Sequence, residues 1–178
     1  MLITISGPPG SGTTTASRIV AHELGLEHVY AGQIFRRLAV ENNMTLEDFG
    51  KYAEEHAEVD WELDRRMVRR ARKGGCVLEG RLTGWMVSRE KVTALRVYLQ
   101  CPEDVRASRV AEREGLTKEK AMRDNRTREA SEGKRYQDIY QIDVRDLSPY
   151  DLVVDSDRHL PEEIAAMITA AARQKFPS

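Results

Sequence analysis

The sequence predicts an α/β fold in which a mainly parallel, five-stranded sheet carries helices on both faces. Two observations lead to this prediction. Short apolar runs alternate with helical patterns along the chain, and a glycine-rich turn joins the first run to a helix. The expected strands are residues 2–6, 27–30, 76–78, 95–99 and 152–155. Because parallel strands end at one edge of a sheet, we expect ligands to bind at that edge.

The connections between these strands are of two kinds. Single helices are expected at residues 14–24, after the glycine-rich turn, and at 161–175, where Pro161 suits a first helical turn. The connection over residues 32–73 is longer and has room for three helices, at 33–41, 45–55 and 59–72. A second long connection, residues 102–149, holds a helical face with Arg106, Arg109 and Arg113 and then a polar, arginine-rich stretch. These two long connections are the expected moving parts.

Composition indicates one folded domain, residues 1–178, and gives no sign of binding to nucleic acid or to a membrane. The chain is 40% hydrophobic and 32% charged, with a net charge of −1, so no global positive field would recruit nucleic acid or a membrane surface. Cys76 and Cys101 are isolated, and the histidines lack ligand spacing, so no structural zinc is expected. Isolated cysteines suit a reducing compartment, and no segment approaches the length of a membrane span. We expect a cytoplasmic protein.

A dense basic run at residues 65–73 is the one feature that suggests nucleic-acid binding. Acidic residues precede it closely, and pairs such as Glu62 with Arg66 have the spacing of neighbours on one helix face. We therefore interpret the run as a solvated helix face.

The glycine-rich turn has the pattern of a phosphate-binding loop. Its residues are Gly7, Pro8, Pro9, Gly10, Ser11, Gly12, Thr13, Thr14 and Thr15. They match G-x-x-x-x-G-K-[ST] with one exception, since Thr13 stands where the lysine is expected. Glycines let successive backbone N–H groups face one anion, and the following helix adds its N-terminal N–H groups. The pattern predicts a site for the phosphates of ATP, with Thr14 as a magnesium ligand.

Two arginines are expected at the same edge of the sheet. Arg36 lies just inside the helix after the second strand, and Arg81 directly follows the third. Two arginines beside a phosphate loop fit a second anion, such as a phosphorylated acceptor, because the guanidinium group binds phosphate in a bidentate manner. Glu79, at the end of the third strand, is a candidate to support the magnesium ion.

At these residues the chain resembles the nucleoside monophosphate kinases, and within them the archaeal-type cytidylate kinases. The resemblance runs essentially end to end. It rests on residues 10–15 (Gly-Ser-Gly-Thr-Thr-Thr), 29–36 (Val-Tyr-Ala-Gly, then Ile-Phe-Arg), 77–86 (Val-Leu-Glu-Gly-Arg, then Gly-Trp-Met), 134–136 (Lys-Arg-Tyr) and 146–152 (Asp-Leu-Ser, then Tyr-Asp-Leu). It implies a P-loop kinase three-layer fold and ATP-dependent phosphorylation of CMP, with dCMP as a further acceptor and Mg²⁺ entering with ATP. A monomer is expected.

The resemblance also implies roles for individual residues. Arg36 and Arg81, with Gly32, would bind the acceptor monophosphate. Arg128, Glu132 and Arg135 would surround the transferring phosphate and the cytosine, and Glu132 departs from the usual Asp or Asn. Arg81, Arg128 and Arg135 are thus the expected catalytic residues. Residues 32–73 would form an acceptor-binding helical insertion, and residues 115–137 a lid whose arginines supply the charge that Thr13 lacks.

Two other functions remain open at the level of the sequence. One is a P-loop kinase for a different small acceptor, such as AMP, UMP or a metabolite, because the residues predict a phosphorylated acceptor without naming its base. The other is a non-catalytic nucleotide-binding module, which the missing lysine keeps open. The arginines near the loop argue against the second alternative.

Overall fold

The computed structural model describes residues 1–177, and residue 178, the last of the predicted domain, lies outside the described residues. Five parallel strands form one sheet in the order β2-β3-β1-β4-β5. The strands are β1 (Leu2–Ser6), β2 (Glu27–Tyr30), β3 (Cys76–Glu79), β4 (Leu95–Gln100) and β5 (Leu152–Asp155). The predicted fold class is therefore confirmed, with β3 and β4 each one residue longer than expected.

Eight helices join or flank these strands within the described part of the chain. They are α1 (Thr13–Leu24), α2 (Ala31–Glu41), α3 (Leu46–Glu55), α4 (Ala57–Ala71), α5 (Thr83–Arg89), α6 (Glu103–Glu114), α7 (Lys118–Tyr140) and α8 (Pro161–Lys175). The sequence predicted neither α5 nor the full length of α7, a single helix of 23 residues.

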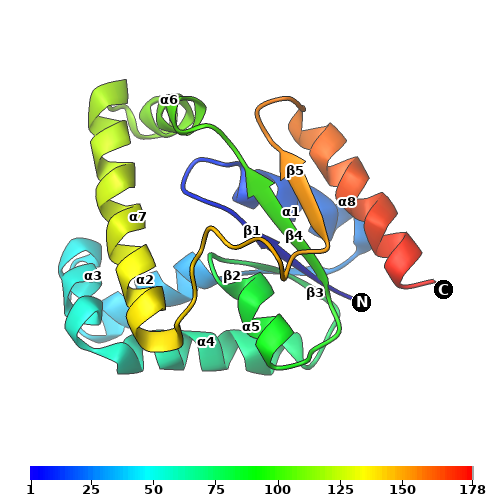
Figure 1. Cartoon of the computed structure of the whole chain (residues 1–178), viewed down its shortest axis with the longest axis horizontal. Helices are drawn as coiled ribbons and strands as arrows, with labels where there is room; N and C mark the ends of the chain where they lie inside the picture. Colours follow the sequence, from blue (N-terminus) through cyan, green and yellow to red (C-terminus); the bar gives the residue numbers. More distant parts are fainter. Residues whose placement is uncertain (178) are drawn as a thin grey trace.

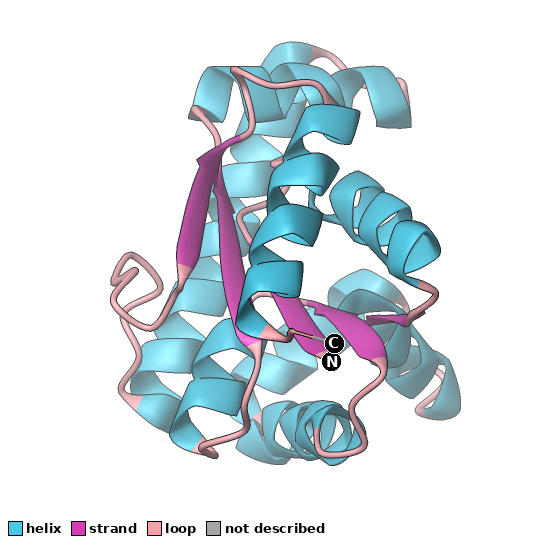
Figure 2. Cartoon of the chain, turned by 90° about the vertical axis from the view of Figure 1, so that its right-hand side faces the viewer, coloured by secondary structure: helices cyan, strands magenta, loops and turns pink. Residues whose placement is uncertain are grey.

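Helices cover both faces of the sheet (Figure 1). Side chains of β1 point alternately to the two faces and pack against different helices. Ile3 and Ile5 are fully buried against α1 and α8, in the largest apolar cluster. Leu2 points to the other face and packs with α4 and α5. Figure 2 shows α8 lying along its face of the sheet, with the two chain ends close together. The core is thus split between the two faces, as in other doubly covered parallel sheets.

The insertion made of α2, α3 and α4 has a small core of its own. Leu38, Phe49 and Val59, one from each helix, are buried together. Thr45 caps α3 by accepting a hydrogen bond from the Asp48 backbone N–H at 3.1 Å.

Helix α7 crosses the molecule from α6 to the insertion, beyond the carboxyl edge of the sheet (Figure 1). Its contacts with the insertion include two hydrogen bonds: Ser131 donates to Glu54 of α3, and Tyr140 donates to Asp64 of α4, each at 2.5 Å. Within residues 1–177, no helix combines the length and apolar character that crossing a membrane requires.

Candidate active site

The glycine-rich turn lies between β1 and α1, and its backbone is shaped to hold an anion. Gly10 and Gly12 have φ values of +82° and +89°, in the left-handed region that favours glycine. A Cβ on Gly10 would come within 2.6 Å of the Arg106 carbonyl oxygen, whereas the nearest neighbour of a Cβ on Gly12 would be Arg109 Nη1, at 4.0 Å. The loop is therefore packed tightly against α6 at Gly10 and less tightly at Gly12, where α1 presents its N-terminal N–H groups.

Glu79 connects the end of β3 to the start of α1. Its Oε1 accepts hydrogen bonds from the hydroxyls of Thr13 at 3.0 Å and Thr14 at 2.5 Å. Its Oε2 lies 2.9 Å from His28 Nε2. The predicted magnesium residues Thr14 and Glu79 thus lie together, and their hydroxyl and carboxylate oxygens are the hard donors that Mg²⁺ prefers. These residues fit a magnesium ion that enters with a nucleotide.

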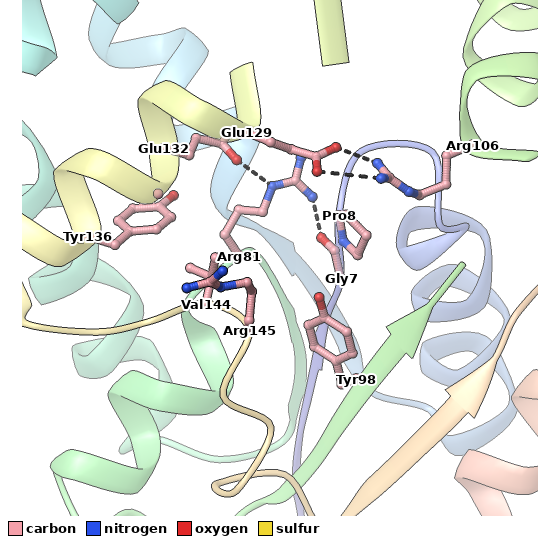
Figure 3. Close-up of a pocket in the computed structure, with 11 residues that line it drawn as sticks. Gly7, Pro8, Arg81, Tyr98, Arg106, Glu129, Glu132, Tyr136, Val144 and Arg145 are labelled. Carbon is pink, nitrogen blue, oxygen red and sulfur yellow. Dashed lines mark hydrogen bonds and ion pairs between the residues drawn. The ribbon is translucent and has the colours of Figure 1, made fainter. Parts of the chain in front are cut away.

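Arg81 lies over the loop and joins it to α7 (Figure 3). Its Nη1 donates a short hydrogen bond to the Gly7 carbonyl, and its Nε donates to Glu132 Oε2 at 2.7 Å. The other oxygen of Glu132 accepts from Arg128 Nε at 2.8 Å. Burial opposes the charge on Glu132, but Arg81 and Arg128 outweigh burial and hold the pKa of that carboxyl below its usual range. Arg81, Arg128 and Glu132 therefore form one charged group at the loop.

Arg135 is placed elsewhere. It is buried, and its guanidinium forms a bidentate ion pair with Asp60 of α4, at 3.0 and 3.2 Å. Its side chain also lies near the rings of Phe35 and Tyr136. The structure thus brings Arg135 to the interface between α7 and the insertion rather than to the loop.

Arg36 and Gly32 both lie around Tyr30. The Arg36 guanidinium is 5.7 Å from the centre of the Tyr30 ring, and a Cβ on Gly32 would come within 2.5 Å of the same ring. Gly32 therefore makes room for Tyr30. Among the described residues that line the pocket beside the loop, neither Arg36 nor Arg135 is found.

That pocket has a volume of about 250 Å³ and lies between the loop and α7 (Figure 3). Its polar lining includes Arg81 and Glu132, which the sequence predicted, and Arg106, Glu129 and Arg145, which it did not. The spacing of Arg106 predicts its place on a helical face but does not indicate that it reaches the loop.

The basic run on α4 is a solvated face, as predicted. Glu62 accepts from Arg66 at 2.7 Å and lies 3.8 Å from Arg65. Arg70 pairs with Glu27 at the sheet edge, at 2.6 Å.

Comparison with solved structures agrees with this architecture. Shikimate kinase from Acinetobacter baumannii, in complex with shikimate, superposes with a TM-score of 0.63 at 16% identity, covering 99% of this chain and 95% of that chain. Shikimate kinase from Bacteroides thetaiotaomicron gives a TM-score of 0.63 at 13% identity, covering 98% and 96%. At these identities the likeness concerns the fold alone, and the predicted P-loop kinase fold is confirmed.

Sequence relatives are much closer. The cytidylate kinase of Pyrococcus horikoshii is 49% identical over 171 residues, covering 96% of this chain and 88% of that protein. The cytidylate kinase of Methanocaldococcus jannaschii is 46% identical over 172 residues, covering 96% and 97%. The model of the cytidylate kinase-like family matches residues 2–158. The resemblance predicted from the sequence is confirmed, and the chain belongs to the cytidylate kinase-like family.

Proposed function

We propose that this protein is a cytidylate kinase, which transfers the γ-phosphoryl group of ATP to CMP, and also to dCMP. One observation carries the proposal: the phosphate loop and Arg81 line one pocket, so donor and acceptor phosphates can meet there. The names of the two relatives support cytosine as the base. Phosphoryl transfer needs positioned reactants and positive charge rather than a reactive side chain, and the pocket offers both.

The donor would be held by the turn between β1 and α1. The loop of residues 7–15 surrounds the ATP phosphates in this proposal, with backbone N–H groups donated by its residues other than Pro8 and Pro9, and the N-terminus of α1 adds its positive dipole. The surroundings of Gly12 support this role, because a Cβ there would have its nearest neighbour, Arg109 Nη1, as far away as 4.0 Å, which leaves room for a phosphate to approach the backbone.

The acceptor would be oriented from the other side of the pocket. Arg81 would hold the phosphate of CMP from within the pocket, and Arg36 would join it from its place beside Tyr30, outside the present pocket lining. One oxygen of this phosphate attacks the γ-phosphorus in line with the bond to ADP. The new P–O bond gives CDP, and the electron pair of the broken bond leaves with ADP. A phosphate dianion attacks without losing a proton, so the reaction needs no general base.

Thr14 and Glu79 would hold the Mg²⁺ that enters with ATP, through the threonine hydroxyl and the carboxylate. When bound, the ion neutralises charge on the donor phosphates. Glu79 also fixes both threonines at the start of α1, so the loop is ordered before a nucleotide arrives.

The two long connections would divide the remaining work. Residues 32–73 form the acceptor-binding insertion, and residues 115–137 form the lid that excludes water during transfer. Arg128 closes over the transferring group, with Glu132 near the acceptor. Arg135 would have to break its ion pair with Asp60 before it could reach the transferring group. Arg128 is therefore the better candidate of the two lid arginines for contact with that group.

A coupled assay of ADP formation tests the proposal. CMP, dCMP, UMP, AMP and GMP are compared with a reaction that lacks an acceptor. We expect activity with CMP and dCMP, and slow ATP hydrolysis without an acceptor because closure depends on acceptor binding. Preference for AMP or UMP would assign a different acceptor. ATP binding without turnover on any acceptor would indicate a non-catalytic nucleotide-binding module.

We place this activity in the cytoplasm and in a monomer. Both cysteines are free, which supports a reducing compartment.

A further inference from the structure

The structure places an arginine, Arg106, at the phosphate loop that lacks the lysine of the motif. The sequence did not predict this position. Arg106, on α6, is buried to 8% side-chain exposure, and its Nη1 donates to the Pro9 carbonyl of the loop at 3.1 Å. Its Nε donates to the Cys101 carbonyl at 3.0 Å. These two backbone contacts fix a permanent positive charge at the rim of the phosphate loop.

Arg106 and Arg81 hold the loop from two sides (Figure 3). Arg81 donates to the carbonyl of Gly7 and Arg106 to that of Pro9. Each arginine also pairs with a glutamate of α7, Arg81 with Glu132 and Arg106 with Glu129 in a bidentate contact. The two carboxylates are three residues apart on one helix face.

The contact with Glu129 is the exchangeable part of this arrangement. The Glu129 side chain is 36% exposed, so it can return to water at low cost, whereas the backbone contacts of Arg106 are internal. A phosphate group offers a guanidinium the same bidentate acceptor geometry with more negative charge than a carboxylate. A polyphosphate entering the pocket would therefore replace Glu129 on Arg106.

The neighbouring arginine of α6 is a poorer candidate for the same role. Arg109 also lies near the loop, but its guanidinium donates to the carbonyl oxygen of Ser156 at 2.8 Å and to the hydroxyl of the same residue at 3.3 Å. It is thus used to tie α6 to the turn after β5.

We propose that Arg106 binds the donor phosphates and supplies the positive charge that the lysine of the motif would give, and that Glu129 occupies its guanidinium until a nucleoside triphosphate displaces it. The inference rests on the proposed function, because it assigns a residue to the donor side of the same pocket. Binding of the donor nucleotide would then also affect α7, because loss of the contact between Glu129 and Arg106 removes one of the links between α7 and the loop.

The test compares two glutamates that both join α6 and α7. Glu129→Gln removes the charge that competes for Arg106. Glu103→Gln is the matched control, because Glu103 pairs with Arg126 at 2.5 and 2.9 Å on the exposed side of the same two helices. The binding of ADP with magnesium is measured by isothermal titration calorimetry without an acceptor, together with thermal unfolding.

We expect Glu129→Gln to tighten ADP binding about fivefold or more, and Glu103→Gln to leave it within about twofold. Arg106→Lys should weaken ADP binding about tenfold while the KM for CMP changes little, since lysine keeps the charge but loses the bidentate fork. Equal effects of the two glutamate variants, or weaker ADP binding in Glu129→Gln, would overturn the inference. If Arg106→Lys proves unstable, the two glutamate variants still decide the matter.

Wild-type ADP formation with CMP, measured on the same preparations, separates this inference from the proposed function. An active wild type with unchanged ADP binding in Glu129→Gln contradicts the role of Arg106 alone. An inactive wild type whose ADP binding tightens in Glu129→Gln contradicts the kinase assignment alone.

Discussion

Helices α8 and α7 are attached to the molecule in opposite ways. In α8, five of 15 residues are buried, and Ile164, Ala165, Ile168 and Ala172 join the main apolar core. In α7, four of 23 residues are buried, and two of these four are Asn125 and Arg135. Where α8 is held mainly by the apolar core, α7 adds only two buried residues, Ala121 and Tyr136, to two small apolar clusters and makes many ion pairs and hydrogen bonds.

This difference bears on what each helix can do. The free energy gained by burying apolar surface is roughly proportional to the buried area, and a charged ligand cannot take the place of these apolar contacts. We therefore expect α8 and the sheet to behave as a fixed scaffold. Ion pairs between arginine and carboxylate can be exchanged for pairs between arginine and phosphate. The contacts of α7 at Arg81 and Arg106 are of this second kind. The α7 side of the molecule is therefore suited to respond to a charged ligand.

The largest expected effect is on catalysis, at the α7 side. Arg81→Ala should lower kcat for CMP roughly 10³-fold, because removing a positioned positive charge from the transferring group costs about 4 kcal/mol of transition-state stabilisation. The melting temperature should also fall, because Glu132, with 13% side-chain exposure, loses one of its two arginine partners, so kcat is measured at a temperature where the variant stays folded. The coupled ADP assay and a thermal melt measure the two quantities. A loss of less than about tenfold would place Arg81 outside the reacting centre.

The second effect is on stability, at the α8 side. Ile168 is fully buried in the main core, so Ile168→Ala should lower the free energy of unfolding by about 3 kcal/mol. Activity at a temperature where the variant stays folded should remain near that of the wild type. Met167→Ala, at the neighbouring position with 36% exposure, is the matched control and should cost less than about 1 kcal/mol in urea unfolding. Similar losses at both positions would mean that α8 is not held by its buried face.

The third effect is a pH dependence at the contact between α7 and the insertion. Burial raises the pKa of Asp64 from 3.8 to about 7, while the hydrogen bond from Tyr140 acts in the opposite direction. At pH values between 3.8 and about 7, Asp64 holds a proton in the folded state and has lost it in the unfolded state. The free energy of unfolding therefore falls as the pH rises through this range. Above it, both states are ionised and the loss levels off.

Asp64→Asn removes this titration and should flatten the profile. Between about pH 5 and 8, the wild type should lose about 2 kcal/mol more free energy of unfolding than the variant. Denaturant unfolding at a series of pH values measures the difference. Parallel profiles for the two proteins would show that Asp64 titrates normally.

The same contrast explains which parts of the fold could be predicted from the sequence. The strands, α1 and α8 were predictable because apolar periodicity and a contiguous loop motif are local signals. Helix α5 was missed because Gly84 lies inside it, and glycine disfavours a helix interior. The structure gives the reason for that glycine: a Cβ there would collide with the ring of Tyr150.

At the site, the residues found by the sequence are those at strand ends. Glu79 and Arg81 follow β3 directly, so the topology alone brings them to the loop. Arg106 and Glu129 lie on two helices that meet through side-chain contacts, and α7 has no apolar stripe from which its facing residues could be predicted. Arg135 is the converse case: its position in the motif suggests the loop, whereas its ion pair with Asp60 holds it at α4, and its catalytic role stays a prediction.

The smallest expected effect is at Thr13 itself, the residue that replaces the lysine. Its hydroxyl donates to Glu79 at 3.0 Å, but Glu79 keeps Thr14 and His28 as partners when this bond is removed. Thr13→Ala should therefore lower kcat/KM for ATP only about threefold, well below the loss at Arg128→Ala. The measurement is the steady-state ATP dependence at saturating CMP. If Thr13→Ala is the more damaging of the two, the loop depends on this threonine for charge or order, and arginines from α6 and α7 do not stand in for the lysine.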